Sequence, residues 1–268
     1  MHWRPVYAVL EREVVRMMRQ RTRLLSAMVR PLIWLFVIGA GFGAVLDQPG
    51  VNYQQFLIPG VLGMTMLFGA MLAALTMVYD KESGVMRMLI IAPFAHYWIV
   101  VAKLLAAALA AIIQALLLLV LLAALGYLTA DTRFGLLAAA LVMTSLACGG
   151  IGMLVAAFTR TLDNFAAIMN FVIFPVFFLS GSLYPVSRLP AALKFVALAN
   201  PYTYGVDLLK HAVSDKLPVG MGADFGVGLD FLVLAGFSAA ALIIASWRFS
   251  RESAYEPMIH ILTGKRGG

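Results

Sequence analysis

The side chains that could support catalysis or bind a metal are few and scattered. No two histidines are spaced to meet on one helix as metal ligands; they are His2, His96, His211 and His260. The serines at positions 145, 180, 182, 187 and 246 have no evident base partner. The run from Leu262 to Arg266 lacks the first glycine and the strand–helix setting of a phosphate-binding loop. We therefore expect no catalytic, cofactor-binding or metal-binding residues, and a chain that is not an enzyme.

Ionisable residues are also rare within the long apolar runs. Ion-coupled transporters and proton pumps need such groups at bilayer depth, because those groups bind the driving ion. Only Lys103 and Asp230 qualify in the clearest runs, each near an end where we expect it to reach the membrane interface. No internal energy source is visible, so any transport must draw its energy from a separate chain.

The elements that carry these residues follow from composition. Hydrophobic residues make up 62% of the chain and charged residues 12%, about half the usual charged fraction. A membrane-spanning helix needs about 20 mostly apolar residues. Five runs qualify, at 57–79, 98–125, 134–158, 164–187 and 225–247. A sixth, 31–46, has sixteen residues and could be extended by Leu24, Leu25 and Met28. They are continuous rather than alternating, which excludes a barrel. The sequence predicts an all-α membrane protein with six transmembrane helices in a single domain, 1–268.

Basic residues predict the orientation. About thirty residues with seven arginines precede the first run, too long a segment for a signal peptide, so we retain that run as a helix. With six spans, fifteen of the twenty Lys and Arg residues fall on the side of the termini. The positive-inside rule then places both termini in the cytoplasm. The other side carries Arg133, Arg188, Lys194, Lys210 and Lys216.

The first segment, 1–25, is predicted to form an amphipathic interface helix. Its apolar residues recur at helical spacing, among them Tyr7, Leu10 and Val14, and Pro5 suits a first turn. The helix would lie along the inner membrane surface. One interpretation is a topological anchor and nothing more. The other is that its exposed face contacts a cytoplasmic partner, with Arg12, Arg16 and Arg19 as candidate contacts.

A second cytoplasmic segment, 80–97, lies between the second and third runs. Asp80, Lys81, Glu82 and Ser83 are suited to begin a short helix, which would become strongly apolar and stop at Pro93. So apolar a helix either folds back onto the membrane surface or docks into a groove on another protein.

The stretch FPVFFLSGSLYPVSRLP, residues 174–190, interrupts a lipid-buried helix with prolines and a glycine. A proline removes a backbone donor, and the freed carbonyl must be met by protein or water. Such backbone is expected beside a cavity or a subunit interface. The alternative is a simple kink at Pro175 and a close helix contact at Gly181. Downstream, Leu189 to Leu198 is expected to form a short helix, and Asn200 with Pro201 to begin another.

Two motifs resemble the permease subunits of ABC-2 type transporters, which include drug, nodulation-factor and polysaccharide exporters. The first is the E-S-G…P segment, matched by Glu82, Ser83, Gly84, Met86, Leu89 and Pro93. Arg87 departs from the family pattern, which often has an acidic residue there, so no charge pair is carried over to that position. The second motif is matched by Pro175, Phe177, Phe178, Leu179, Ser180, Gly181, Tyr184, Pro185, Leu189 and Pro190, and then by Asn200, Pro201, Thr203, Tyr204, Val206, Asp207, Leu209 and Lys210.

The resemblance implies the permease subunit of an exporter in the cell inner membrane, dimeric with itself or a related permease. ATP and Mg would be bound by a separate ATPase subunit. The coupling contacts would be Glu82, Ser83, Gly84, Met86, Arg87, Leu89 and Pro93. A re-entrant element and short outer-face helices would occupy 174–212, with Pro175, Phe177, Phe178, Gly181, Tyr184 and Pro185 at an exit gate and Asn200, Pro201, Tyr204 and Asp207 in an outer-face helix. Residues 250–268 would form a cytoplasmic tail.

The substrate implied is hydrophobic, lipid-linked or drug-like. Two other functions remain open: a membrane scaffold that recruits an ATPase without transporting anything, and an ion-coupled secondary transporter. The scarcity of buried carboxylates disfavours the latter.

Overall fold

The structure is a computed structural model, and it describes residues 4–19, 28–46, 53–86, 97–128, 132–213 and 222–263. Within these ranges every regular element is a helix. Four helices are long and apolar enough to cross a membrane: α4 (Tyr53–Glu82), α6 (Tyr97–Ala124), α7 (Phe134–Phe158) and the Val227–Arg251 part of α11 (Val227–Thr263). The prediction of a multi-pass helical protein is therefore confirmed for four of the six expected spans.

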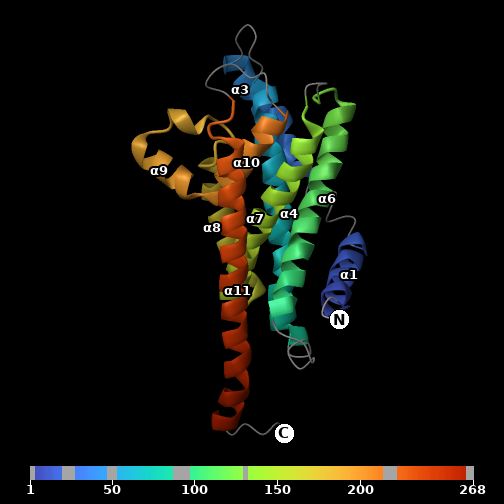
Figure 1. Ribbon diagram of the computed structural model, residues 1–268. Helices are drawn as coiled ribbons and strands as arrows, with labels where there is room; N and C mark the ends of the chain where they lie inside the picture. Colours follow the sequence, from blue (N-terminus) through green and yellow to red (C-terminus); the bar gives the residue numbers. More distant parts are fainter. Residues whose placement is uncertain are drawn as a thin grey trace.

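Helix α4 forms the centre of the bundle. Its most apolar stretch is 78% buried, against 17% for that of α11. A helix that is apolar all round, as α4 is, has to be covered on every side. Helices α6 and α7 pack against it over their lengths, while α11 runs along the bundle beside α7 (Figure 1).

The two remaining apolar runs form shorter helices. Met28–Ala44 contains the π-helical turn η1 (Trp34–Ile38) and continues into α3 (Gly39–Leu46), and α8 spans Leu162–Phe178. Seventeen residues of α8 extend about 25 Å, less than the hydrocarbon core of about 30 Å. The run expected at 164–187 is thus helical only in its first part.

Short elements occupy the two ends of the bundle. After α8 come η2 (Val186–Arg188), α9 (Ala191–Ala199) and α10 (Pro201–Val213), near the end where α4 begins. At the opposite end, α1 (Arg4–Arg19) lies against α6, and α11 extends past its neighbours toward the C-terminus (Figure 1).

The short helix expected to begin at Asp80 does not begin there. Helix α4 continues through Glu82, and the Ser83 amide still donates to the Tyr79 carbonyl at 2.9 Å. Gly84 then adopts φ +76°, the left-handed conformation that ends many helices and that glycine adopts without a Cβ clash. The E-S-G motif is therefore a helix stop. Arg87, Leu89 and Pro93 lie outside the described residues.

Candidate functional site

Five charged side chains meet where α1, α4 and α6 adjoin, and we call this group the charged junction: Arg12, Glu13, Arg16, Asp80 and Lys103. The Lys103 ammonium lies 2.6 Å from Glu13 Oε1 and 2.5 Å from Asp80 Oδ2. Arg12 contacts the same two carboxylates at 2.9 and 2.7 Å. Arg16 approaches Asp80 at 3.7 Å and lies over the Tyr79 ring. The junction thus ties the N-terminal helix to two helices of the bundle.

The centre of the junction is buried. The Lys103 side chain is 2% exposed and that of Asp80 3%, so the expectation that Lys103 reaches the interface is wrong. Its charge is accommodated because two carboxylates neutralise it directly. Burial alone would raise the pKa of Glu13, but the neighbouring Lys103 and Arg12 charges outweigh burial and lower that pKa below its ordinary value.

Lys81 and Glu82, which follow Asp80 in α4, contact the ends of α7 and α8. The Lys81 ammonium approaches the carbonyls of Ala156, Ala157 and Thr159 at the C-terminal end of α7, at 3.1 to 3.5 Å. The Glu82 carboxylate accepts from the Leu162 amide, the first of α8, at 2.9 Å. A cation at a helix C-terminus and an anion at an N-terminus are both favourable to the helix dipole.

Three consecutive residues therefore connect α4 to four neighbours. Successive side chains on a helix point about 100° apart, so Asp80, Lys81 and Glu82 face different directions. Asp80 reaches α1 and α6, Lys81 reaches α7, and Glu82 reaches α8. Movement of the last turn of α4 must then displace all four helices or break these contacts.

The other predicted residues at this end of the bundle differ in exposure. Ser83 is exposed, and its hydroxyl donates to the Tyr79 carbonyl at 2.7 Å. Met86 is buried in the main core, whereas Arg19 is exposed. In α1 the side chains turned to the bundle include Val9 and Glu13, while Tyr7 is 68% exposed. The apolar face expected for α1 is thus only partly the face that packs.

The turn after α8 is held against α4 by close backbone approach. Gly181 has φ +77°, and an added Cβ would meet Val186 Cγ2 at 2.7 Å. A Cβ on Gly60 of α4 would lie 2.5 Å from the Ser182 carbonyl oxygen. Glycine permits such approach between elements. The hydroxyl of Tyr184 donates back to the Phe178 carbonyl at 2.5 Å, which closes the turn.

The prolines and aromatic residues of this segment differ in burial. Pro175 is exposed and lies inside α8, which continues past it to Phe178; Pro185 is buried and precedes η2. Phe177 is buried, and both it and Phe178 meet the Trp34 ring edge-on, at centroid distances of 5.5 and 5.8 Å. These contacts join α8 to the π-helical turn of the first apolar helix.

Helix α10 begins as the sequence predicts. It starts at Pro201, and Asn200 Oδ1 accepts from the Tyr202 amide at 3.1 Å, which is an N-cap contact. Asn200 Nδ2 also donates to the Val176 carbonyl of α8 at 2.7 Å. The Tyr204 hydroxyl donates to the Leu198 carbonyl of α9. Asn200 thereby connects α10 to α8, and Tyr204 connects α10 to α9.

Asp207 holds the segment that precedes α11. Its two carboxylate oxygens accept from the amides of Asp224 and Phe225, at 2.6 and 3.0 Å. Asp224 in turn accepts from the amides of Val186 and Ser187 in η2. Lys210 is 2% exposed, and its ammonium lies 3.6 Å from Asp224 Oδ2.

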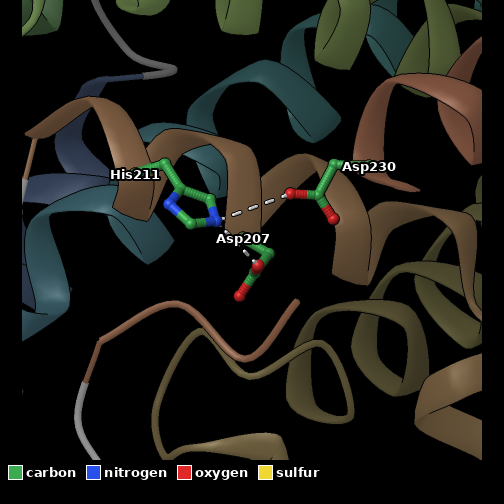
Figure 2. Close-up of side chains that lie close together, drawn as sticks. All are labelled: Asp207, His211 and Asp230. Carbon is green, nitrogen blue, oxygen red and sulfur yellow. Dashed lines mark ion pairs between the residues drawn. The ribbon is translucent and has the colours of Figure 1, made fainter. Parts of the chain in front are cut away.

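A second charged group adjoins Asp207 (Figure 2). His211 Nε2 lies 3.7 Å from Asp207 Oδ2 and 4.0 Å from Asp230 Oδ2. Asp230 is fully buried, so the expectation that it reaches the interface is wrong. The i, i+4 spacing of Asp207 and His211 was the one available signal of this group. Glu13 and Asp224 gave no sequence signal, because Lys103 lies 90 positions from Glu13 and the η2 amides lie 38 and 37 positions from Asp224.

Comparison with known proteins identifies the family. The model of the ABC-2 type transporter family matches residues 4–213. The chain is 28% identical to nodulation protein J of Rhizobium leguminosarum bv. trifolii over 226 residues, which cover 82% of this chain and 85% of that protein. It is 25% identical to the putative transport permease ycf38 of Pyropia yezoensis over 220 residues, covering 78% and 74% respectively. The chain therefore belongs to the ABC-2 type transporter family, as a multi-pass membrane permease.

Proposed function

We propose that this chain is the membrane-spanning subunit of an ATP-driven exporter. It carries a hydrophobic, lipid-linked or drug-like substrate outward across the inner membrane, with both termini in the cytoplasm. ATP and Mg are bound by a separate ATPase subunit, and the permease works as a dimer with itself or a close relative. The ABC-2 family membership supports an ATPase partner.

The observation that carries the proposal is the linked end of α4. The charged junction and the contacts of Lys81 and Glu82 join α1, α6, α7 and α8 to the end of α4, where the E-S-G turn begins. If an ATPase bound at that turn and moved it, the movement would be transmitted to α1, α6, α7 and α8. Such a linkage would let a subunit without its own energy source transmit movement from a partner to its helices.

Exposed apolar surface supports a dimer within lipid. On α8, Phe171 is 80% exposed and Phe174 51%, and on α11, Leu232 is 72% and Ile243 67% exposed. These exposed apolar side chains can be covered either by lipid or by a second permease subunit. Apolar groups of this kind also suit the hydrophobic substrate that we propose.

The test compares the ATPase alone with the ATPase bound to this permease. The permease is purified with the ATPase that copurifies with it and reconstituted in lipid vesicles. The double variant Lys81→Met and Glu82→Gln should assemble normally and lose most of the permease-dependent change in ATP hydrolysis. Asp163→Asn, which alters an exposed acid in the first turn of α8, is the matched control. Unchanged hydrolysis in the double variant would overturn the coupling role, and failure of any ATPase to copurify would overturn the proposal.

Ion-coupled transport is the second candidate, because Asp230 is a fully buried carboxylate. Buried acids within membrane helices bind driving ions in such transporters. Vesicles that contain the permease alone, with a proton gradient and a fluorescent lipid probe, separate the two functions. Probe movement without nucleotide that is lost in Asp230→Asn would favour ion coupling. We expect no such movement.

A further inference from the structure

The group formed by Asp207, His211 and Asp230 places two buried carboxylates beside one imidazole. The donor atoms of the three residues lie within 4.8 Å of one another. Asp230 is 0% exposed, and neither of its carboxylate oxygens accepts a hydrogen bond from the part of the chain that the structure describes. A buried carboxylate without a donor is costly and calls for a counter-charge or a ligand.

The neighbouring groups do not supply that counter-charge. Asp224 is paired with Lys210 and accepts two backbone amides. Asp207 also accepts two amides but contacts no lysine or arginine among the described residues. With His211 neutral and all three carboxylates ionised, three negative charges face the one ammonium of Lys210. A divalent cation favours that ionised state and would cancel the excess of two charges.

The geometry of the donor atoms suits a metal ion. A metal about 2.1 Å from each donor separates neighbouring donors by about 3.0 to 3.4 Å and opposite donors by about 4.2 Å. The distances from His211 Nε2 to Asp207 Oδ2 and Asp230 Oδ2 are 3.7 and 4.0 Å, and all the donor atoms lie within 4.8 Å of one another. The donors must therefore move together by about 0.3 to 0.6 Å to form a coordination shell. Figure 2 shows dashed lines from the His211 imidazole to one oxygen of each carboxylate.

The chemistry of the donors narrows the choice of metal. One imidazole nitrogen with two carboxylate oxygens is typical of Zn²⁺ and Mn²⁺ sites, whereas Ca²⁺ and Mg²⁺ prefer oxygen alone. In the structure the Phe225 carbonyl oxygen accepts a hydrogen bond from His211 Nε2 at 2.8 Å. A metal would replace this hydrogen bond and leave the carbonyl oxygen free to serve as a fourth donor. His211 would then carry its proton on Nδ1 and present the Nε2 lone pair to the metal.

From these observations we infer that Asp207, His211 and Asp230 form a binding site for a divalent transition-metal ion, Zn²⁺ or Mn²⁺. The ion clamps α10 to the first turn of α11, at the end of the bundle opposite the charged junction. The His211 side chain is 22% exposed, so the ion can reach the site from the surface at this residue. This assigns a metal to a chain whose sequence predicts none.

Thermal unfolding with and without metal tests the site. The protein is purified without a histidine tag, treated with a chelator and titrated separately with Zn²⁺ and Mn²⁺. At a metal concentration about 100 times Kd, we expect Tm to rise by about 5 °C or more. The variants Asp230→Asn and His211→Gln should weaken binding at least tenfold, whereas Asp163→Asn, at an exposed carboxylate, should leave it unchanged. No rise in Tm for the parent, or a rise that both site variants retain, would overturn the inference.

A second measurement leaves the site intact, in case its variants fold poorly. Replacing His2, His96 and His260 with alanine leaves His211 as the only histidine. Mn²⁺ bound to this variant should show the magnetic coupling of one imidazole nitrogen in pulsed electron paramagnetic resonance. Bound Mn²⁺ without nitrogen coupling would place the metal elsewhere and overturn the assignment to His211.

Discussion

Lys103 has two carboxylates within 2.6 Å, Glu13 and Asp80, and is almost fully buried. Its replacement by methionine leaves both carboxylates buried without their central cation. We expect Lys103→Met to lower the free energy of unfolding by about 3 kcal/mol or more, because breaking one side of a buried ion pair is strongly destabilising. Equilibrium unfolding in mixed detergent–SDS micelles, followed by tryptophan fluorescence, measures the loss.

Two further variants make this result specific. Lys194→Met changes an exposed lysine of α9 and should be nearly neutral. The triple variant Lys103→Met, Glu13→Gln and Asp80→Asn removes the buried charges together and should recover much of the loss. A Lys103→Met protein as stable as the parent would show that the junction does not hold α1 to the bundle.

Gly84 tests the helix stop at the end of α4. Its φ is +76°, and an added Cβ would meet nothing within 4 Å. The cost of a side chain there is therefore a backbone cost alone. We expect Gly84→Val to lower the free energy of unfolding by about 1 to 2 kcal/mol relative to Gly84→Asn, since asparagine tolerates the left-handed conformation. Gly135→Val, at an open position with ordinary φ, is the control, and equal stability of the two Gly84 variants would contradict the helix-stop interpretation.

Among the elements, the turn after α8 depends on its contact with α4. A Cβ on Gly60 would lie 2.5 Å from the carbonyl oxygen and 2.9 Å from the Cα of Ser182, and backbone atoms in a closed turn cannot easily move. We expect Gly60→Ala to cost about 1 to 3 kcal/mol through overpacking. The same unfolding assay measures it. Gly41→Ala, where a Cβ meets nothing within 4 Å, should be neutral or stabilising, and a neutral Gly60→Ala would refute the close approach.

The sequence predicts those features of these elements that neighbouring residues determine, and it misses those that depend on residues distant in the chain. The Asn200 cap and the Pro201 helix start rest on neighbouring residues, and the structure confirms them. The error at Asp80 has a local cause as well: acidic residues suit a helix start, but here the preceding helix simply continues to the left-handed Gly84. The burial of Lys103 and Asp230 depends on partners up to 90 positions away, which no single-sequence pattern reports.

At the scale of the whole molecule, long apolar runs predict crossing helices well, because the bilayer imposes their length. Four helices in the described part of the chain are long and apolar enough to cross. Orientation is a further prediction, from the excess of Lys and Arg on the side of the termini. Two serines can report this orientation, because they lie near opposite ends of α4. Ser83 follows the C-terminal end of α4, and Ser187, in η2, lies near the N-terminal end of α4. The thirty residues of α4 extend about 45 Å between these ends.

Cysteine labelling on the two sides of the membrane measures this orientation. Cys148 is the single cysteine and is buried, so Cys148→Ala provides a background without thiols. Ser83 and Ser187 are both exposed, and each is replaced by cysteine in that background. With cytoplasmic termini, a membrane-impermeant maleimide should label Ser187→Cys in intact spheroplasts and Ser83→Cys only after permeabilisation. The reverse pattern would invert the topology and place the E-S-G turn out of reach of any cytoplasmic ATPase, which would remove the physical basis for coupling through the end of α4.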